Sequence, residues 1–183
     1  MLADAGLPAV PCTVRAVATP KPPRDHVDDL IDQWRTERPD LDLAPMAVVG
    51  RLGRVAAHLG RAIDAVFAGH GLGVGEFDLL AALRRSGEPF AMRPTDLAHS
   101  LMLSPAGTTH RLDRLESAGW ITRHPDPASR RSSVVRLTAA GRKLVDGVVA
   151  EHVANERELL TALSPRELTT FDGALRKLLH QFE

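Results

Sequence analysis

The stretch PTDLAHSLMLSPAGTTHRLDRLESAGWITRHPDPASRRSSVVRLT, residues 94–138, decides how the rest of the chain is organised. Pro94 suits the first position of a helix, because its missing N–H would be unpaired there in any case. Ser104 followed by Pro105 is an N-cap with a proline at the next position, so a second helix is predicted to begin there. Gly119 fits the end of that helix, where the backbone usually turns left-handed. The stretch therefore predicts two short helices with a tight break between them.

A β-hairpin is predicted to follow these helices. Residues 120–125 and 133–137 alternate apolar and polar side chains, as paired strands do. Residues 126–129 have the composition of a turn, and Arg130 and Arg131 mark its tip. The order helix, turn, helix, hairpin is that of winged DNA-binding modules. Phe90 to Met92 is a candidate short strand that joins the hairpin.

The second helix has a packed side and a polar side. Thr108, Leu112 and Leu115 fall together and should pack on the first helix. Small and hydrogen-bonding side chains fall on the other side of its N-terminal half, as the major groove of DNA requires, although an ordinary solvated helix has the same appearance. The residues predicted to contact DNA, in this helix and in the hairpin, are Ser104, Ala106, Thr108, Thr109, His110, Arg114, Arg130 and Arg131.

Charge is distributed unevenly along the chain. Residues 104–143 hold eight Lys and Arg side chains against three acids, a local charge of +5 in a chain of formal net charge zero. This excess is typical of a surface that faces phosphates. Residues 25–42 hold seven acids against two arginines, a local charge of −5. The acidic segment is therefore expected to lie away from the DNA-binding face.

Residues 103–144, LSPAGTTHRLDRLESAGWITRHPDPASRRSSVVRLTAAGRKL, resemble the recognition helix and wing of the MarR regulators. The wing is followed by that family's Leu-Thr-x-x-Gly, here residues 137–141. The resemblance runs from about Asp25 to the C-terminus. It implies a homodimeric winged helix-turn-helix protein whose affinity for DNA is altered by a small ligand or an oxidant. Ser129 is a departure, because the family usually carries an acid there.

Composition supports a mainly α-helical protein, to which the predicted β-hairpin adds a small wing. Hydrophobic residues make up 44% of the 183 residues but aromatic residues only 4%, so the core should consist of helices packed through aliphatic side chains. Cys12 is the single cysteine, which excludes an internal disulfide. No signal peptide or membrane span is recognised, and a cytoplasmic protein is expected. The scattered histidines indicate no metal site, no cofactor motif is present, and no nucleophile–base constellation indicates an enzyme.

Four segments are predicted along the chain. Residues 1–23 form a mobile Pro-rich tail; residues 24–74 are N-terminal helices that support the dimer and a ligand pocket. Residues 75–137 form the winged helix-turn-helix module, and residues 138–183 form C-terminal dimerisation helices. Local signals predict where the other helices start and end. Helices are predicted from Asp25 to a stop at Pro39, from Pro45 to Gly69, and from Gly75 to Arg85. Thr138 caps the next helix, and the capping box Ser164-Pro165-Arg166-Glu167 opens the last one.

The terminal helices carry more apolar positions than one wing module can cover. These positions are Val145, Val148, Val149, Val153, Leu159, Leu160 and Leu163, then Leu168, Phe171, Leu175, Leu178 and Leu179. A large exposed apolar stripe usually indicates association, although both helices could also fold back on their own chain. The family resemblance favours a homodimer through these helices, with help from the N-terminal helix, on a pseudo-palindromic site.

Two charges fall on apolar helix faces. Asp78 lies in an almost wholly apolar helix, and Arg111 leans toward the packed side of the recognition helix. They either form a structural ion pair or line a pocket for a small anionic guest beside Trp34. These three residues resemble the ligand site of the urate-responsive subgroup, which also has an extra N-terminal helix. Ser86 and Thr109 are candidates for a further polar contact, and the resemblance implies a regulator, typically a repressor, that such a ligand releases from DNA.

Two alternatives remain open. Cys12 could sense oxidants, but only Arg15 lies near it in sequence to lower its pKa. A helical protein that binds other proteins through its basic face would have the same charge pattern.

Overall fold

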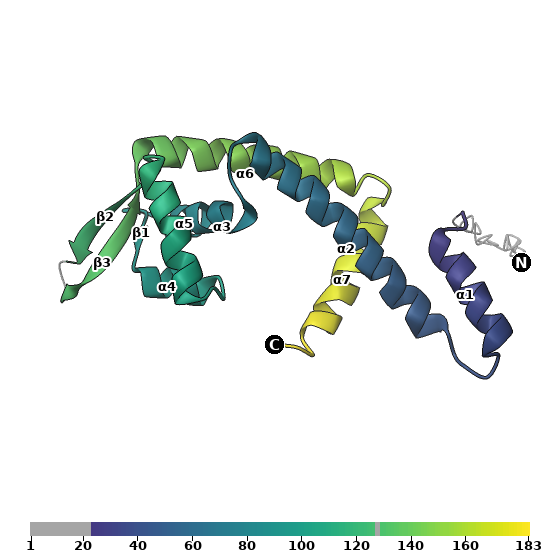
Figure 1. The fold of residues 1–183 in the computed structure, drawn as a ribbon. Coiled ribbons are helices and arrows are strands. Elements are labelled where there is room, and N and C mark those ends of the chain that lie inside the picture. The colour runs from purple at the N-terminus through teal and green to yellow at the C-terminus, as the bar shows by residue number, and fades with distance from the viewer. Residues whose placement is uncertain (1–22, 127–128) are drawn as a thin grey trace, which may run out of the picture. The chain divides into compact units, whose positions relative to one another are not determined.

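The computed structural model describes residues 23–126 and 129–183, with backbone alone for Pro105 and residues 129–131. The elements, in chain order, are α1 (His26–Glu37), α2 (Ala44–Gly69), α3 (Val74–Arg85), β1 (Ala91–Met92), α4 (Pro94–Ser100), α5 (Pro105–Ser117), β2 (Ile121–Asp126), β3 (Ser129–Leu137), α6 (Ala139–Leu159) and α7 (Pro165–Leu179) (Figure 1). This order confirms the predicted mainly α-helical fold with a winged helix-turn-helix. The predicted caps Asp25, Ser104, Thr138 and Ser164 each begin their helix.

The chain divides into two compact units at Leu52 and Gly53, within α2. In the first unit, α1 and the start of α2 pack through a small core of Val27, Ile31 and Leu43. Arg51 donates to the carboxylates of Asp25 and Asp28, which cap α1. These hydrogen bonds from Arg51 lower the pKa of Asp25.

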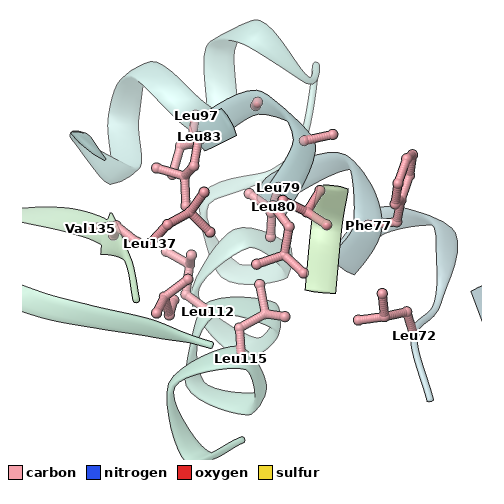
Figure 2. Packing of buried hydrophobic residues seen from close by; sticks show 14 of the residues in the cluster. Leu72, Phe77, Leu79, Leu80, Leu83, Leu97, Leu112, Leu115, Val135 and Leu137 are labelled. Carbon is pink, nitrogen blue, oxygen red and sulfur yellow. The ribbon is translucent and has the colours of Figure 1, made fainter. Parts of the chain in front are cut away.

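The core of the second unit is built around α3. Leu79, Leu80 and Leu83 are fully buried, because α4, α5, α6 and β3 all contact this helix. Figure 2 shows these leucines meeting Leu112 and Leu115 of α5 in one continuous cluster. α3, whose sequence is an almost continuous apolar run, is therefore the central helix of this unit.

The wing is a three-stranded antiparallel sheet of order β1-β3-β2. The predicted short strand at Phe90–Met92 is confirmed, with Ala91 opposite Arg136. β3 begins at Ser129, four residues before the predicted start, and pairing resumes at Asp126 and Ser129 after a register shift. Residues 129–133 are all polar, so alternation could not reveal this part of the strand.

The junction between the wing and α6 explains the Leu-Thr-x-x-Gly pattern. Thr138 caps α6 by accepting a hydrogen bond from the Gly141 N–H, and its hydroxyl donates to the Gly119 carbonyl. A Cβ at Gly141 would collide with the Trp120 carbonyl oxygen. Only glycine allows α6 to begin this close to the segment that follows α5.

α6 and α7 bury very different fractions of their apolar residues. Val145 and Val148 are fully buried, and α3 is the helix that α6 contacts most. Their assignment to the dimer surface is therefore wrong, because they complete the core of their own chain. Val149 and Val153 are exposed. α7, which is described over its whole length, buries no residue.

No single helix among the described residues is both long and apolar enough to cross a membrane. Helices α2 and α3 together satisfy the length and composition of a span, but they are bent by 74° at the break between them.

Candidate nucleic-acid interface

The N-terminus of α5 is built by local hydrogen bonds. Ser104 caps the helix, with its hydroxyl accepting from the Gly107 N–H at 3.2 Å. Pro105 follows at the first helical position. The unpaired N–H groups and positive dipole of this end suit it to a phosphate or a base edge.

α5 presents a buried face and an exposed face. Leu112 and Leu115 are buried against α3 and α4, as predicted. Thr108 is only 2% exposed, and its hydroxyl donates to the Ser104 carbonyl at 3.0 Å. The prediction that Thr108 contacts DNA is therefore wrong, because its polar group is buried and already bonded. Its placement on the packed side is correct. The residues that remain on the exposed face are Ala106, Thr109 and His110, with Arg114 at the next turn.

Arg114 is anchored by a buried acid that sequence reasoning missed. Its Nε lies 3.0 Å from Glu76 Oε1, with the Arg114 side chain 61% exposed and that of Glu76 only 4%. Glu76 also accepts the Gly73 N–H at the start of α3. The ion pair therefore holds the guanidinium of a largely exposed arginine at a buried carboxylate. The capping position of Glu76 was the one available sequence signal.

The Arg111 side chain lies close to two glycines, Gly75 and Gly107. A Cβ on Gly75 or Gly107 would collide with its guanidinium, and its Nη1 donates to the Gly107 carbonyl at 3.0 Å. It makes no ion pair with Asp78, although both residues are described. The predicted Asp78–Arg111 pair is therefore wrong. The side chains point to different neighbours, although they lie on contacting helices.

A cavity of about 490 Å³ opens between the start of α3 and α5. Its lining is Gly73, Val74, Gly75, Glu76, Gly107, His110, Arg111 and Arg114. Two guanidinium groups against one paired carboxylate give it a net positive lining. Of the predicted ligand residues, Arg111 lines this cavity and Asp78 does not.

Asp78, also on α3, interacts with residues that do not line this cavity. Burial raises the pKa of its carboxyl, and the charges of Arg85 and His152 lower that pKa by less. His152 of α6 lies beside the stacked rings of Phe67 and Phe77. Asp78 thus belongs to the contact between α3 and α6.

The remaining ligand candidates are placed separately. Trp34 lies on α1 in the first unit, with 46% of its surface exposed. Ser86 donates its hydroxyl to the Leu83 carbonyl at 2.7 Å at the end of α3. Cys12 lies outside the described residues. The described ranges contain no group of three or more His, Cys, Asp or Glu residues that could hold a metal ion.

Two ion pairs connect the wing to the helix-turn-helix. Asp126 is almost fully buried; it accepts from Arg93 Nε at 2.7 Å and from the Ser132 hydroxyl at 3.0 Å. Arg123 pairs with Asp113 of α5 at 2.6 Å. Both contacts tie the hairpin to the helix-turn-helix.

Arg130 and Arg131 lie within β3 and not in a turn. The register joins Asp126 to Ser129, so the two arginines are the first residues after that pair on β3. This places their backbone near the free end of the arm that β2 and β3 form, which projects away from α4 and α5 (Figure 1). A role for them in DNA binding stays a prediction.

Comparison with known proteins gives a consistent result. The MarR family model matches residues 72–133. The HTH-type transcriptional regulator PecS of Dickeya dadantii (strain 3937) is 47% identical over 153 residues, which cover 84% of this chain and 92% of that protein.

Solved structures show the same fold. A mutant of MarR from E. coli, complexed with operator DNA, superposes with a TM-score of 0.63 at 26% identity over 75% of this chain and 97% of that one. BpsR of Bordetella bronchiseptica, whose DNA binding is regulated by 6-hydroxynicotinic acid, gives a TM-score of 0.61 at 26% identity over 72% of this chain and 91% of that one.

Proposed function

The chain belongs to the MarR family of transcriptional regulators, which bind DNA, and we propose that it acts as a repressor. In this proposal a homodimer binds a pseudo-palindromic operator and leaves it when a small anionic ligand binds. The observation that carries the proposal is the division of α5 into one buried face and one exposed, hydrogen-bonding face.

Direct contact with DNA is assigned to the exposed face of α5. Because Thr109 and His110 are both exposed on α5, we expect them to reach base edges in a major groove. Arg114, which is paired with Glu76 but remains largely exposed, is suited to bind a phosphate. Fixing a cation before DNA arrives lowers the conformational entropy lost on binding. Arg130 and Arg131 are assigned to the flanking minor groove.

Dimer formation is supported by the exposed apolar row on α7. Leu168, Phe171 and Leu175 recur at helical spacing and are 36–38% exposed. A stripe of this kind on a soluble helix usually marks an interface. A twofold axis would place two α5 helices on one side of the DNA, about 10 bp apart.

Selection from a random pool of duplexes tests this function. We expect the enriched sequence to contain two inverted half-sites, bound by a dimer. His110→Ala should reduce affinity about tenfold. His58→Ala, at an exposed position of α2, is the matched control and should not. No enriched sequence, or tight binding by a monomer, would contradict the proposal.

The ligand is proposed to enter the cavity that Arg111 lines. A volume of about 490 Å³ with two arginines suits a small aromatic or carboxylic acid. The relative BpsR, which responds to 6-hydroxynicotinic acid, supports this class. An acid that pairs with Arg111 would compete with the Gly107 carbonyl and alter the start of the recognition helix. The ligand acts only through better binding to the form that does not bind DNA.

Urate and 6-hydroxynicotinate are the first ligands to titrate against the selected duplex. An effective ligand should weaken DNA binding by about 5- to 150-fold, the usual range of coupling. Arg111→Gln should abolish the response, whereas Arg85→Gln, at the end of α3, should retain it. Trp34→Phe and Asp78→Asn test the two remaining residues of the sequence prediction. A normal response by Arg111→Gln would place the ligand elsewhere.

A further inference from the structure

Met102 occupies an unusual position in the turn between α4 and α5. It is 95% exposed, whereas its neighbours Leu101 and Leu103 pack against the core. Its φ of 52° lies in the left-handed region. The turn is closed by hydrogen bonds from the Met102 N–H to the His99 carbonyl and from the Leu103 N–H to the Ala98 carbonyl. Any residue at this position must therefore adopt the same backbone.

Folding alone does not favour methionine here. Glycine and asparagine adopt a left-handed backbone at lower cost than other residues. A methionine that is almost fully exposed also gains nothing from burial. Residues that break local rules without a gain in stability are typical of functional sites.

The position of Met102 indicates what it meets. It precedes the N-cap Ser104 by two residues, so it lies at the end of α5 that is proposed to enter the major groove. Among the described residues between Val74 and Val149, it is the only large hydrophobic side chain that is exposed. A protein-binding surface needs a contiguous apolar patch, which an isolated side chain does not provide.

We propose that Met102 contacts the 5-methyl group of a thymine in each operator half-site. This methyl is the one apolar group on the major-groove edge of a base pair. A methionine side chain is flexible and polarisable, so it can follow a methyl whose position varies between sites. The inference rests on the proposed function, and makes Met102 a specificity residue in addition to Thr109 and His110.

Deoxyuridine scanning of the selected duplex tests the contact, because each replacement removes one methyl group and no hydrogen-bonding atom. For the parent protein, one thymine per half-site should lose about fourfold in affinity when replaced, the value expected for one buried methyl. Met102→Leu should show the same loss. Met102→Asn should bind the thymine and deoxyuridine duplexes equally at that site, while other positions behave as in the parent.

Thermal unfolding separates this effect from misfolding. Asparagine suits the left-handed backbone, so Met102→Asn should melt at the same temperature as the parent or higher. The inference is overturned if Met102→Asn and the parent respond alike to deoxyuridine at every position. It is also overturned if the variant loses affinity equally for both duplexes, because the contact would then lie on the sugar. If the parent protein selects no duplex, the proposed function is overturned, and the inference about Met102 is overturned with it.

Discussion

Helices α5 and α7 are similar in length and both are amphipathic, but only α5 finds its partners within its own chain. Leu112 and Leu115 of α5 are buried against α3 and α4. On α7, Phe171 and Leu175 stay more than one-third exposed, and the helix buries no residue. The polar face of α5 is therefore exposed, as the proposed contact with DNA requires, and the apolar face of α7 is exposed, as the proposed dimer requires.

The comparison shows that an amphipathic pattern indicates how much surface must be covered, but not by what. The apolar stripe of α5 is buried by packing within the chain, whereas the apolar stripe of α7 stays exposed. If α7 pairs with a second copy, its contribution to stability must depend on protein concentration. The contribution of α5 to stability must not depend on protein concentration.

The largest expected effect concerns the buried face of α5. Leu115→Ala should lower the free energy of unfolding by about 3 kcal/mol, because the cavity at a fully buried site cannot collapse completely. The loss should be the same at low and high protein concentration in urea denaturation. The matched variant Leu175→Ala on α7 should show a loss that varies with concentration. Equal behaviour of the two variants would remove the distinction.

A charge on α7 tests the dimer surface directly. Phe171→Asp places a carboxylate in the proposed interface, where desolvation should weaken dimerisation by at least about 30-fold. Sedimentation velocity at micromolar concentration should then show a folded monomer. Thr170→Asp, one residue earlier and fully outside the apolar row, is the control and should remain dimeric. A dimeric Phe171→Asp would exclude this face.

Arg131 in the wing is proposed to bind DNA together with the exposed face of α5. Arg131→Ala should weaken binding by about tenfold on most sequences and lower the slope of log affinity against log salt by about one. Fluorescence anisotropy at several salt concentrations measures both quantities. Arg157→Ala, in the last turn of α6, should leave the slope unchanged. An unchanged slope for Arg131→Ala would contradict the role assigned to the wing.

Two adjacent threonines resolve the faces of α5 more finely. Thr108→Ala should lower stability by about 1 kcal/mol, since its buried hydroxyl bonds the Ser104 carbonyl. Thr109 is exposed, so Thr109→Ala should lower stability by less than Thr108→Ala and should weaken specific binding several-fold. Measuring both variants by thermal unfolding and by anisotropy separates packing from contact with DNA. The reverse result would mean that the faces have been exchanged.

The smallest effect is a pH dependence in α3, the helix that supports α5. Burial raises the pKa of the Asp78 carboxyl, so the folded protein binds this proton more tightly than the unfolded chain. Stability from this group therefore falls as pH rises from about 3.8 through the raised pKa. Asp78→Asn should be more stable than the parent above that window, and the difference should shrink below it. Urea denaturation at several pH values checks the sign, and a difference that grows toward low pH would contradict it.

The sequence by itself determined where most elements begin and end. Ser104, Thr138 and Ser164 act on backbone N–H groups three residues away, so each cap can be read locally. The family pattern and the charge excess similarly led to the recognition helix. The polar start of β3 at Ser129 escaped prediction, because pairing with a neighbouring strand, and not alternation, places it there.

Only the tertiary structure decided which side chains meet. Glu76 pairs with Arg114, 38 residues away, and Asp126 pairs with Arg93 across 33 residues. Arg111 lies against Gly75 and Gly107 and not against Asp78. Helical periodicity indicates which face of its own helix a residue occupies. Partners on another helix depend on how the two helices cross, and the neighbouring glycines determine how closely a guanidinium can approach.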